Sequence, residues 1–224
     1  MAKIHGVAGE WARVRGTVIG LWPLFLGVFA TGASVTLLWT HLLAGWILLA
    51  LSLCSVLLSL MFGMRRVESF FKGARGEEKI AGILATLPDS YHVFNDFVVG
   101  RSHIDHVVIG PGGVFAIETK CWRGTVTVEE GHILLDGQLP DRPPLAQAKR
   151  EAALVKKALQ AAGWAGGVMP VLVFASNTFS AHRANVQGAV VMNANELRGS
   201  FDTERVVIPT VELARLVSLM ENRA

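Results

Sequence analysis

The chain has 224 residues, of which 51% are hydrophobic, and its formal net charge is +3. Its mean hydropathy is positive, which excludes an ordinary soluble domain, and the small charge excludes a dedicated DNA-packaging protein. The two cysteines, Cys54 and Cys121, provide no disulfide framework and fit a reducing, cytosolic environment.

The apolar excess lies at the front of the chain. No Asp, Glu, Lys or Arg occurs from Thr17 to Phe62. As one helix this run would be ~70 Å long, against a hydrocarbon core of ~30 Å, so it is expected to cross a membrane twice. The predicted spans are residues 16–36 and 42–62, joined by a turn near residues 37–41. The predicted organisation is then a cytoplasmic segment at 1–15, a transmembrane hairpin at 16–63, a juxtamembrane linker at 64–72 and a further domain at 73–224.

Positive residues flank this apolar run on both sides, whereas the predicted turn carries no Lys or Arg: they are Lys3, Arg13, Arg15, Arg65 and Arg66. This asymmetry predicts a multi-pass protein of the cell (inner) membrane, with both termini and the C-terminal domain in the cytoplasm. The lipid bilayer is therefore one expected partner. A cleaved signal peptide is the alternative, with residues 31–33 as a poor cleavage site; it would leave one span and the same cytoplasmic domain.

Residues 68–87 are predicted to form a helix that stops at Pro88. Ala74, Glu77, Ala81 and Leu84 fall on one stripe of this helix, so Glu77 is the charged member of an apolar face. A carboxylate on a buried face requires a cation or a hydrogen-bond donor. The alternative is an N-terminal charge favoured by the helix dipole.

Two strands joined by a tight turn are predicted next, at residues 104–109 and 114–120, around the sequence Gly-Pro-Gly-Gly at 110–113. If the turn is centred between residues 111 and 112, Asp105 lies opposite Glu118, with Cβ atoms ~5 Å apart. Lys120 lies on the same face as Glu118. A bulge in the turn would instead put the two acids on opposite faces.

Two carboxylates in this arrangement repel each other unless a divalent cation binds between them. The alternative is a solvated strand face with an edge charge at Asp105. The apolar neighbours on both faces favour a central strand pair instead, with Val107, Ile109, Val114 and Ala116 on the acid face and Ile104, Val108, Phe115 and Ile117 on the other.

The run Ile104-Asp105-His106-Val107-Val108-Ile109-Gly110, followed by Gly113-Val114-Phe115-Ala116-Ile117-Glu118-Thr119-Lys120 and Gly124, resembles the core of the nuclease-related domain, which is similar to the wider PD-(D/E)xK nucleases. The resemblance covers residues from about 72 to the strand at 168. Ile104 replaces the proline of the wider superfamily, as is normal in the narrower family.

The resemblance implies an α/β fold, with a restriction-endonuclease-like mixed sheet flanked by helices and preceded here by the two transmembrane helices. It also implies that Asp105 and Glu118 hold Mg²⁺, with Mn²⁺ as a substitute, and that Lys120 acts beside the attacking water. Further roles are implied for Glu77 on the preceding helix and Gln147 on the following one.

The remaining elements alternate between strands and helices, which favours a mixed sheet. A strand pair at 124–139 precedes a helix at 145–162, introduced by Pro143-Pro144 and ended by Gly163. Gln147 borders the buried stripe of this helix; the alternative is a plain surface glutamine. Strands are predicted at 168–175, 189–192 and 206–208, and a closing helix at 211–221.

Two histidines flank Asp105. His103 lies opposite Lys120 in the same register and could assist proton transfer, whereas His106 points to the other face and is expected to be structural. Imidazoles beside carboxylates also suit a transition metal, although no Cys/His spacing supports a closed zinc site. Basic residues that could line a nucleic-acid groove, or simply form solvated helix faces, are Lys72, Arg75, Arg123, Arg142, Lys149, Arg150, Lys156 and Lys157.

The sequence therefore predicts a membrane-anchored, Mg²⁺-dependent nuclease acting on nucleic acid, with DNA as the expected substrate. Its catalytic residues are predicted to be Lys120, Glu118, Asp105 and Gln147. Its metal ligands are predicted to be Asp105, Glu118, Glu77 and the carbonyl of Thr119. A non-catalytic module that tethers nucleic acid or a protein to the membrane remains an alternative, as does an assembly protein that binds no nucleic acid.

Overall fold

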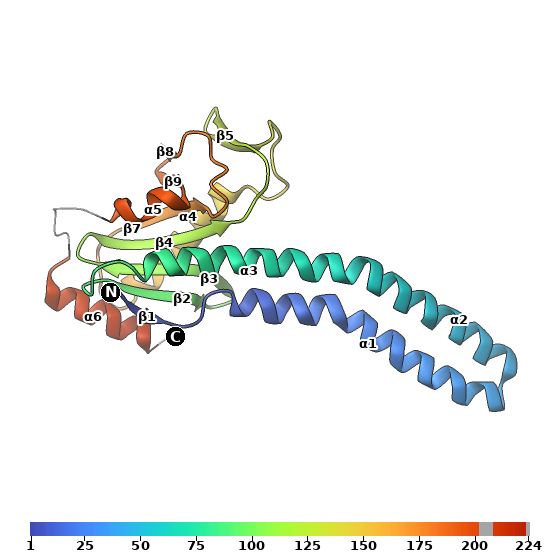
Figure 1. The fold of residues 1–224 in the computed structure, drawn as a ribbon. Coiled ribbons are helices and arrows are strands. Elements are labelled where there is room, and N and C mark those ends of the chain that lie inside the picture. The colour runs from blue at the N-terminus through green and yellow to red at the C-terminus, as the bar shows by residue number, and fades with distance from the viewer. Residues whose placement is uncertain (202–207, 223–224) are drawn as a thin grey trace. The chain divides into compact units, whose positions relative to one another are not determined.

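The computed structural model describes residues 1–201 and 208–222. These divide into two compact units (Figure 1). One unit comprises Met1–Gly9 together with Arg75–Ala224, and the other comprises Glu10–Ala74. The N-terminal residues therefore belong to the same unit as the C-terminal part of the chain.

The second unit is a helical hairpin. It consists of α1 (Glu10–Thr40), α2 (Leu42–Leu58), a π-helical turn (Ser59–Gly63) and the first half of α3 (Met64–Leu84). The turn was predicted at residues 37–41. In the structure it is shorter, and only His41 separates the two helices. Residues 64–72, predicted to be a linker, are helical. No proline occurs between Pro23 and Pro88, so the returning helix continues from the apolar segment into the polar one.

Small residues allow α1 to pack closely against the returning chain. A Cβ on Gly16 would lie 2.4 Å from Cβ of Phe70, and one on Gly20 would lie 2.3 Å from Cγ2 of Val67. Any side chain larger than hydrogen at these two positions would therefore push the helices apart.

Both helices of the hairpin are long and apolar enough to cross a membrane by length and composition. Large apolar side chains on them are exposed rather than packed in a core: Trp22, Phe25, Phe29, Trp39, Leu43 and Leu51 are each more than half exposed. A core helix of a soluble protein would bury such side chains.

The first unit is built on a seven-stranded mixed sheet with the order β1-β2-β3-β4-β7-β9-β8. Its strands are β1 (Lys3–His5), β2 (His92–Val99), β3 (Ser102–Gly110), β4 (Gly113–Lys120), β7 (Val168–Phe174), β8 (Arg183–Val186) and β9 (Ala189–Asn193). A separate two-stranded sheet contains β5 (Val126–Glu129) and β6 (His132–Leu135). The predicted mixed α/β fold is confirmed.

Strand β1 was not predicted. Residues 1–15 were expected to be a plain cytoplasmic segment, but Lys3–His5 pairs in parallel with β2 at the edge of the sheet. Gly6, with φ of +76°, then turns the chain away, and a side chain there would collide with the carbonyl oxygen of Asn95. A strand of three residues is too short to show a period in the sequence, and only its partner stabilises it.

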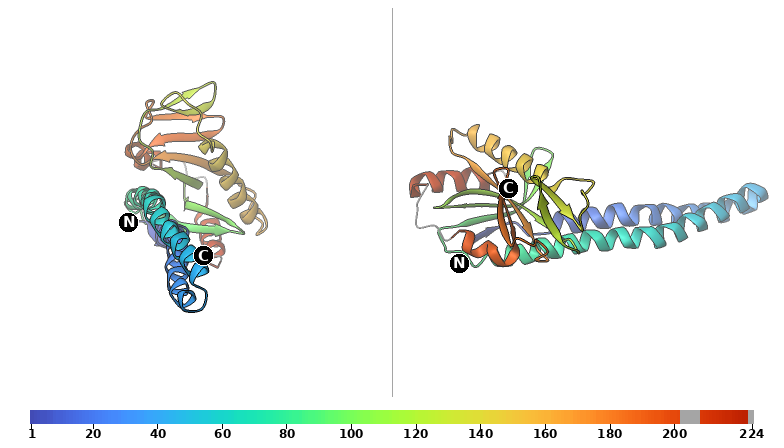
Figure 2. Two further views of the ribbon diagram at one scale, coloured as in Figure 1. Left: turned by 90° about the vertical axis from the view of Figure 1, so that its right-hand side faces the viewer. Right: turned by 90° about the horizontal axis from the view of Figure 1, so that it is seen from above.

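Helices cover both faces of the sheet (Figure 2). One face packs against α4 (Pro144–Gln160) and α6 (Thr210–Glu221), whose side chains Val155, Leu159 and Leu216 contact the core around Phe94 and Val107. The other face packs against α3 and α5 (Ala194–Leu197), which a short 3-10 turn (Arg198–Ser200) follows. The central strands are thus buried on both faces, as their apolar composition predicted.

The hairpin register agrees with the prediction near the turn. Gly110 pairs with Gly113 and Ile109 with Val114, with no bulge between them. Helices α4 and α6 and strands β7 and β9 occupy the predicted positions within one or two residues. The strand predicted at 206–208 falls largely outside the described residues.

Candidate active site

The sheet forks between β3 and β4, and the candidate site lies at this fork. Their ladder ends at the pair His106 and Ile117, one pair short of Asp105 and Glu118. Beyond that point β3 pairs with β2 only, through Ile104, and β4 pairs with β7 only. The predicted direct pairing of Asp105 with Glu118 across the ladder is therefore not present, and neither is that of His103 with Lys120.

The irregular backbone at Asp96 accompanies this fork. Asp96 interrupts the β2–β3 ladder opposite Asp105 and has φ of +51°, which L-residues rarely adopt. Ile104 consequently packs in the same core cluster as Val107, although simple alternation puts them on opposite faces. This break in alternation is why the predicted face assignment is wrong for Ile104.

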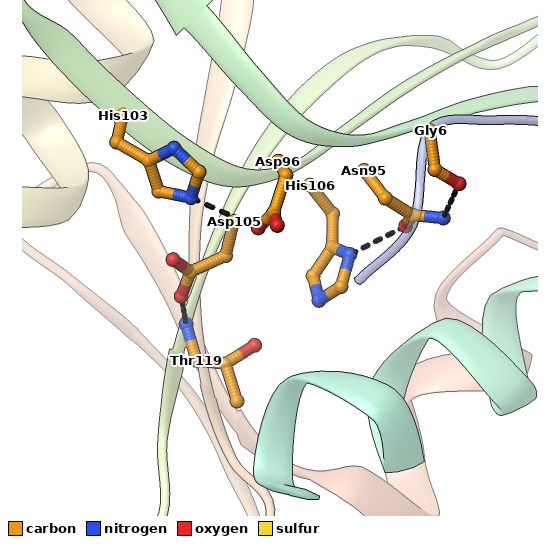
Figure 3. Close-up of polar contacts among 7 residues, drawn as sticks. All are labelled: Gly6, Asn95, Asp96, His103, Asp105, His106 and Thr119. Carbon is orange, nitrogen blue, oxygen red and sulfur yellow. Dashed lines mark hydrogen bonds and ion pairs between the residues drawn. The ribbon is translucent and has the colours of Figure 1, made fainter. Parts of the chain in front are cut away.

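The Asp105 side chain reaches across the fork to β4. Its Oδ2 accepts a hydrogen bond of 2.7 Å from the backbone N–H of Thr119, as Figure 3 shows. The carboxylate thus satisfies a main-chain donor at the point where the two strands separate. This bond fixes Asp105 beside the carboxyl end of β4.

A chain of polar contacts connects β4 to α4. Lys120 Nζ forms an ion pair with Glu118 Oε1 and donates a hydrogen bond of 3.0 Å to Gln147 Oε1. Gln147 Nε2 in turn donates to Glu151 Oε1 at 2.9 Å. Gln147 therefore lies at the site, as expected, and Glu151 joins the site one helical turn further along α4.

A second group of side chains gathers around Asp105. Glu77 of α3, His103 and Asp105 each offer a ligand atom within 4.8 Å of the others. His103 Nε2 also contacts Asp96 Oδ1 at 2.9 Å (Figure 3). Glu77 is thus beside Asp105 as predicted, whereas His103 lies with the acids instead of opposite Lys120.

The crowded carboxyl groups repel one another, and their pKa values record this. Burial, followed by the charges of Glu118 and Glu77, raises the pKa of Asp105 well above its ordinary value. Burial, followed by the charge of Asp96, raises the pKa of Glu77 to about 7. Burial, followed by the charge of Glu118, raises the pKa of Glu151 to about 9. The cluster therefore contains more carboxyl groups than the nearby positive charges can balance.

The same surroundings favour the charged form of Lys120. Burial alone lowers the pKa of its ammonium group, but the charge of Glu118 and its hydrogen bond to that group outweigh burial, so the net pKa is raised. Lys120 accordingly keeps its proton at neutral pH and acts as a cation and hydrogen-bond donor.

His106 is a structural residue, as the sequence suggested. It is fully buried, and its Nδ1 lies 2.8 Å from Asn95 Oδ1. Asn95 Nδ2 also donates to the carbonyl of Gly6 at 3.4 Å, so this network ties the end of β1 to the middle of β3 (Figure 3). Burial lowers the pKa of His106 to about 3, which keeps the imidazole neutral.

The donor set fits a hard divalent cation. Glu77 Oε2 and Glu118 Oε2 are buried and have no hydrogen-bond partner among the described residues. Carboxylate oxygens are the ligands that Mg²⁺ and Mn²⁺ prefer. A cation would also relieve the repulsion that, in addition to burial, raises the pKa values of the acids.

Two residues of this site were missed in the sequence. Asp96 lies in a strand that carried no predicted role, and only the fold brings it to His103. Glu151 did have a signal, because it follows Gln147 by four residues on the same helix face.

A comparison with protein families agrees with this geometry, since residues 72–175 match the family model described as "Nuclease-related domain". These residues form a nuclease-related domain. The matched segment contains Glu77, Asp105, Glu118, Lys120 and Gln147 and ends just after β7.

One curated relative is an uncharacterized protein of Bacillus anthracis, which is 34% identical over 82 residues. The match covers 34% of this chain and 39% of the relative, so the chain spans well under half of that protein's length. No solved structure was found to match the chain.

Proposed function

We propose that the nuclease-related domain is a metal-dependent phosphodiester hydrolase that acts on nucleic acid, with DNA as the expected substrate. The observation that carries this proposal is the buried acid cluster at the strand fork, directly beside Lys120, whose raised pKa keeps it charged at neutral pH. Excess carboxylate next to a fixed cation is suited to a site that takes up a divalent ion and a phosphate together.

Asp105, Glu118 and Glu77, with the Thr119 carbonyl, would hold Mg²⁺ or Mn²⁺. Such an ion, when bound, lowers the pKa of a coordinated water and neutralises charge on the phosphate. The Thr119 N–H orients Asp105 through the bond already described. Lys120 donates to the attacking water or to a phosphate oxygen and stabilises the charge that develops there. Gln147 positions Lys120 by accepting a hydrogen bond from its ammonium group.

The proposed location is a cell membrane, with the domain on its cytoplasmic side. Two apolar helices with exposed side chains support membrane insertion, and the positive flanks support the orientation. Six of the eight basic residues predicted to line a groove are exposed and could contact a polyanion: Arg75, Arg123, Arg142, Arg150, Lys156 and Lys157.

The test is a cleavage assay of the full-length protein in detergent or nanodiscs, on single- and double-stranded DNA and RNA with Mg²⁺ or Mn²⁺. Asp105→Asn preserves the shape of the side chain but removes its charge, and Gln147→Ala removes one of the two hydrogen-bond partners of Lys120 described above. Changes to residues that support metal ligands typically lower activity roughly 10–100-fold. We expect Gln147→Ala to lower the cleavage rate within that range, and Asp105→Asn to lower it further.

Two matched controls use exposed positions of the same residue types, Asp141→Asn and Gln160→Ala. Both should retain wild-type rates. Equal activity of Asp105→Asn and Asp141→Asn would contradict the proposed mechanism. Salt-sensitive binding of nucleic acid without cleavage in the wild type would indicate a tethering module instead.

A further inference from the structure

A second cluster of metal-binding side chains lies away from the candidate active site, at the β1 edge of the sheet. It consists of His5 at the end of β1, His92 at the start of β2 and Glu221 in the last turn of α6. Each offers a ligand atom within 4.8 Å of the others. All three belong to the same compact unit, although they come from the two ends and the middle of the chain.

We propose that this cluster is a binding site for a transition-metal ion of the Zn²⁺ class, which would join the N-terminal strand to the C-terminal helix. His5 Nε2 and His92 Nδ1 lie 3.3 Å apart. Two nitrogens that bind one tetrahedral zinc at ~2.0–2.1 Å are separated by roughly 3.3 Å, so this pair already has the required spacing. The arrangement needs little movement of either imidazole.

The surroundings hold the two imidazoles in place. The His5 ring stacks on Phe94, with centroids 4.4 Å apart and planes 12° from parallel. His92 is 8% exposed, so its position is set by the core.

Glu221 supplies the negative ligand. Its Oε1 lies 3.7 Å from His5 Nδ1, and its side chain is about half exposed, so a rotation of this side chain can bring an oxygen to the ion. Two histidines and one glutamate form a ligand set that zinc uses when a fourth position stays open. A pocket of about 430 Å³, lined in part by His92 and Glu221, leaves room for water at that position. Lys3 also lines this pocket, and its charge weakens the affinity for any cation.

The site differs from the acid cluster at the fork in its chemistry. Imidazole ligands select zinc and related ions, whereas a set dominated by carboxylates selects Mg²⁺ or Mn²⁺. The proposal therefore does not depend on the domain being a nuclease.

The experiment is a titration of full-length, EDTA-treated protein with Co²⁺, followed by displacement with Zn²⁺, in the presence of excess Mg²⁺. Visible absorption reports the coordination of Co²⁺, and dialysis against Zn²⁺ gives the number of bound ions. The variants are His5→Asn and the conservative, exposed Glu221→Gln. The control is His132→Asn, at an exposed histidine of the separate two-stranded sheet.

We expect the wild type and His132→Asn each to bind one Zn²⁺. The Asp105→Asn variant should bind this ion as well. We expect His5→Asn to lose this ion and Glu221→Gln to bind it at least about tenfold more weakly. Equal zinc stoichiometry and affinity in the wild type, His5→Asn and Glu221→Gln would overturn the proposal and leave a simple hydrogen bond between the imidazoles. Loss of the ion in Asp105→Asn alone would assign it to the fork and would also overturn the proposal.

Discussion

At the scale of single residues, the site depends on carboxyl groups that are held close together against their mutual repulsion. Asp105 is fixed by the Thr119 N–H, and Glu118 is fixed by Lys120. Glu151 reaches the same group from α4 and is 4% exposed. Close approach of like charges in a buried place destabilises the metal-free fold, and ion binding reverses this.

Glu151 should make the stability of the metal-free protein depend on pH. Its pKa rises from an ordinary value of 4.5 to about 9 on folding. Between these values the unfolded chain ionises while the folded chain keeps the proton, so this group makes stability fall as the pH rises. In Glu151→Gln we expect stability to fall less steeply as the pH rises. Near pH 8 the melting temperature of the variant should exceed that of the wild type by about 2–4 °C or more, and near pH 5 the difference should be smaller.

Thermal unfolding in EDTA at several pH values measures this effect. Glu129→Gln, at an exposed position of β5, is the control and should follow the wild type. Parallel profiles for Glu151→Gln and the wild type across the whole range would show that Glu151 does not carry a raised pKa in the folded protein.

At the scale of elements, the two membrane-type helices pack through small residues on α1. Gly20 has Val67 so close that any side chain would collide with it, whereas nothing lies within 4 Å of a Cβ placed on Gly32 of the same helix. Thr31 Oγ1 also donates to Ser52 Oγ at 3.0 Å between the helices. Close backbone approach is the main source of association where the surroundings are as apolar as the helices.

Gly20→Ala should therefore weaken the hairpin, and Gly32→Ala should not. We expect a lower melting temperature and faster proteolysis in detergent for Gly20→Ala. Gly32→Ala should be neutral or more stable by up to about 0.5–1 kcal/mol, because alanine favours the helix. If both variants have the melting temperature of the wild type, the close packing of α1 does not stabilise the hairpin.

The sheet shows how one interrupted ladder creates the site. The predicted register is correct from Gly110 and Gly113 as far as His106 and Ile117 and then ends. Asp105 and Glu118 were expected as cross-strand neighbours, but they lie at the mouth of a fork that α3 and α4 reach with Glu77 and Gln147. A periodic pattern predicts where strands pair, but side-chain competition for main-chain donors decides where pairing stops.

At the scale of the whole molecule, pairing of β1 with β2 constrains the proposed membrane topology. The residues just before α1 belong to the same sheet as the nuclease-related domain. A chain that leaves this sheet, crosses a membrane and returns to it must cross an even number of times. The fold thus supports the even number of crossings that the charged flanks suggested.

We expect both ends of the protein to be on the cytoplasmic side. In a background with Cys54 and Cys121 changed to serine, His41→Cys should react with a membrane-impermeant thiol reagent added to intact cells. Tags at the N- and C-termini should be accessible only after the membrane is opened or inverted. An N-terminal tag that is accessible from outside would contradict both the orientation and the pairing of β1.

The sequence by itself determined the features that recur over short windows. The long apolar run, the positive flanks, the β3–β4 register and the Asp105, Glu118 and Lys120 motif can be derived from local spacing. Tertiary structure decided which distant groups meet: His5 and His92 are 87 positions apart, and Lys120 and Gln147 are 27 apart. It also decided the short strand β1, the fork and the place of Asp96 and Glu151, because these depend on partners and burial that no local pattern specifies.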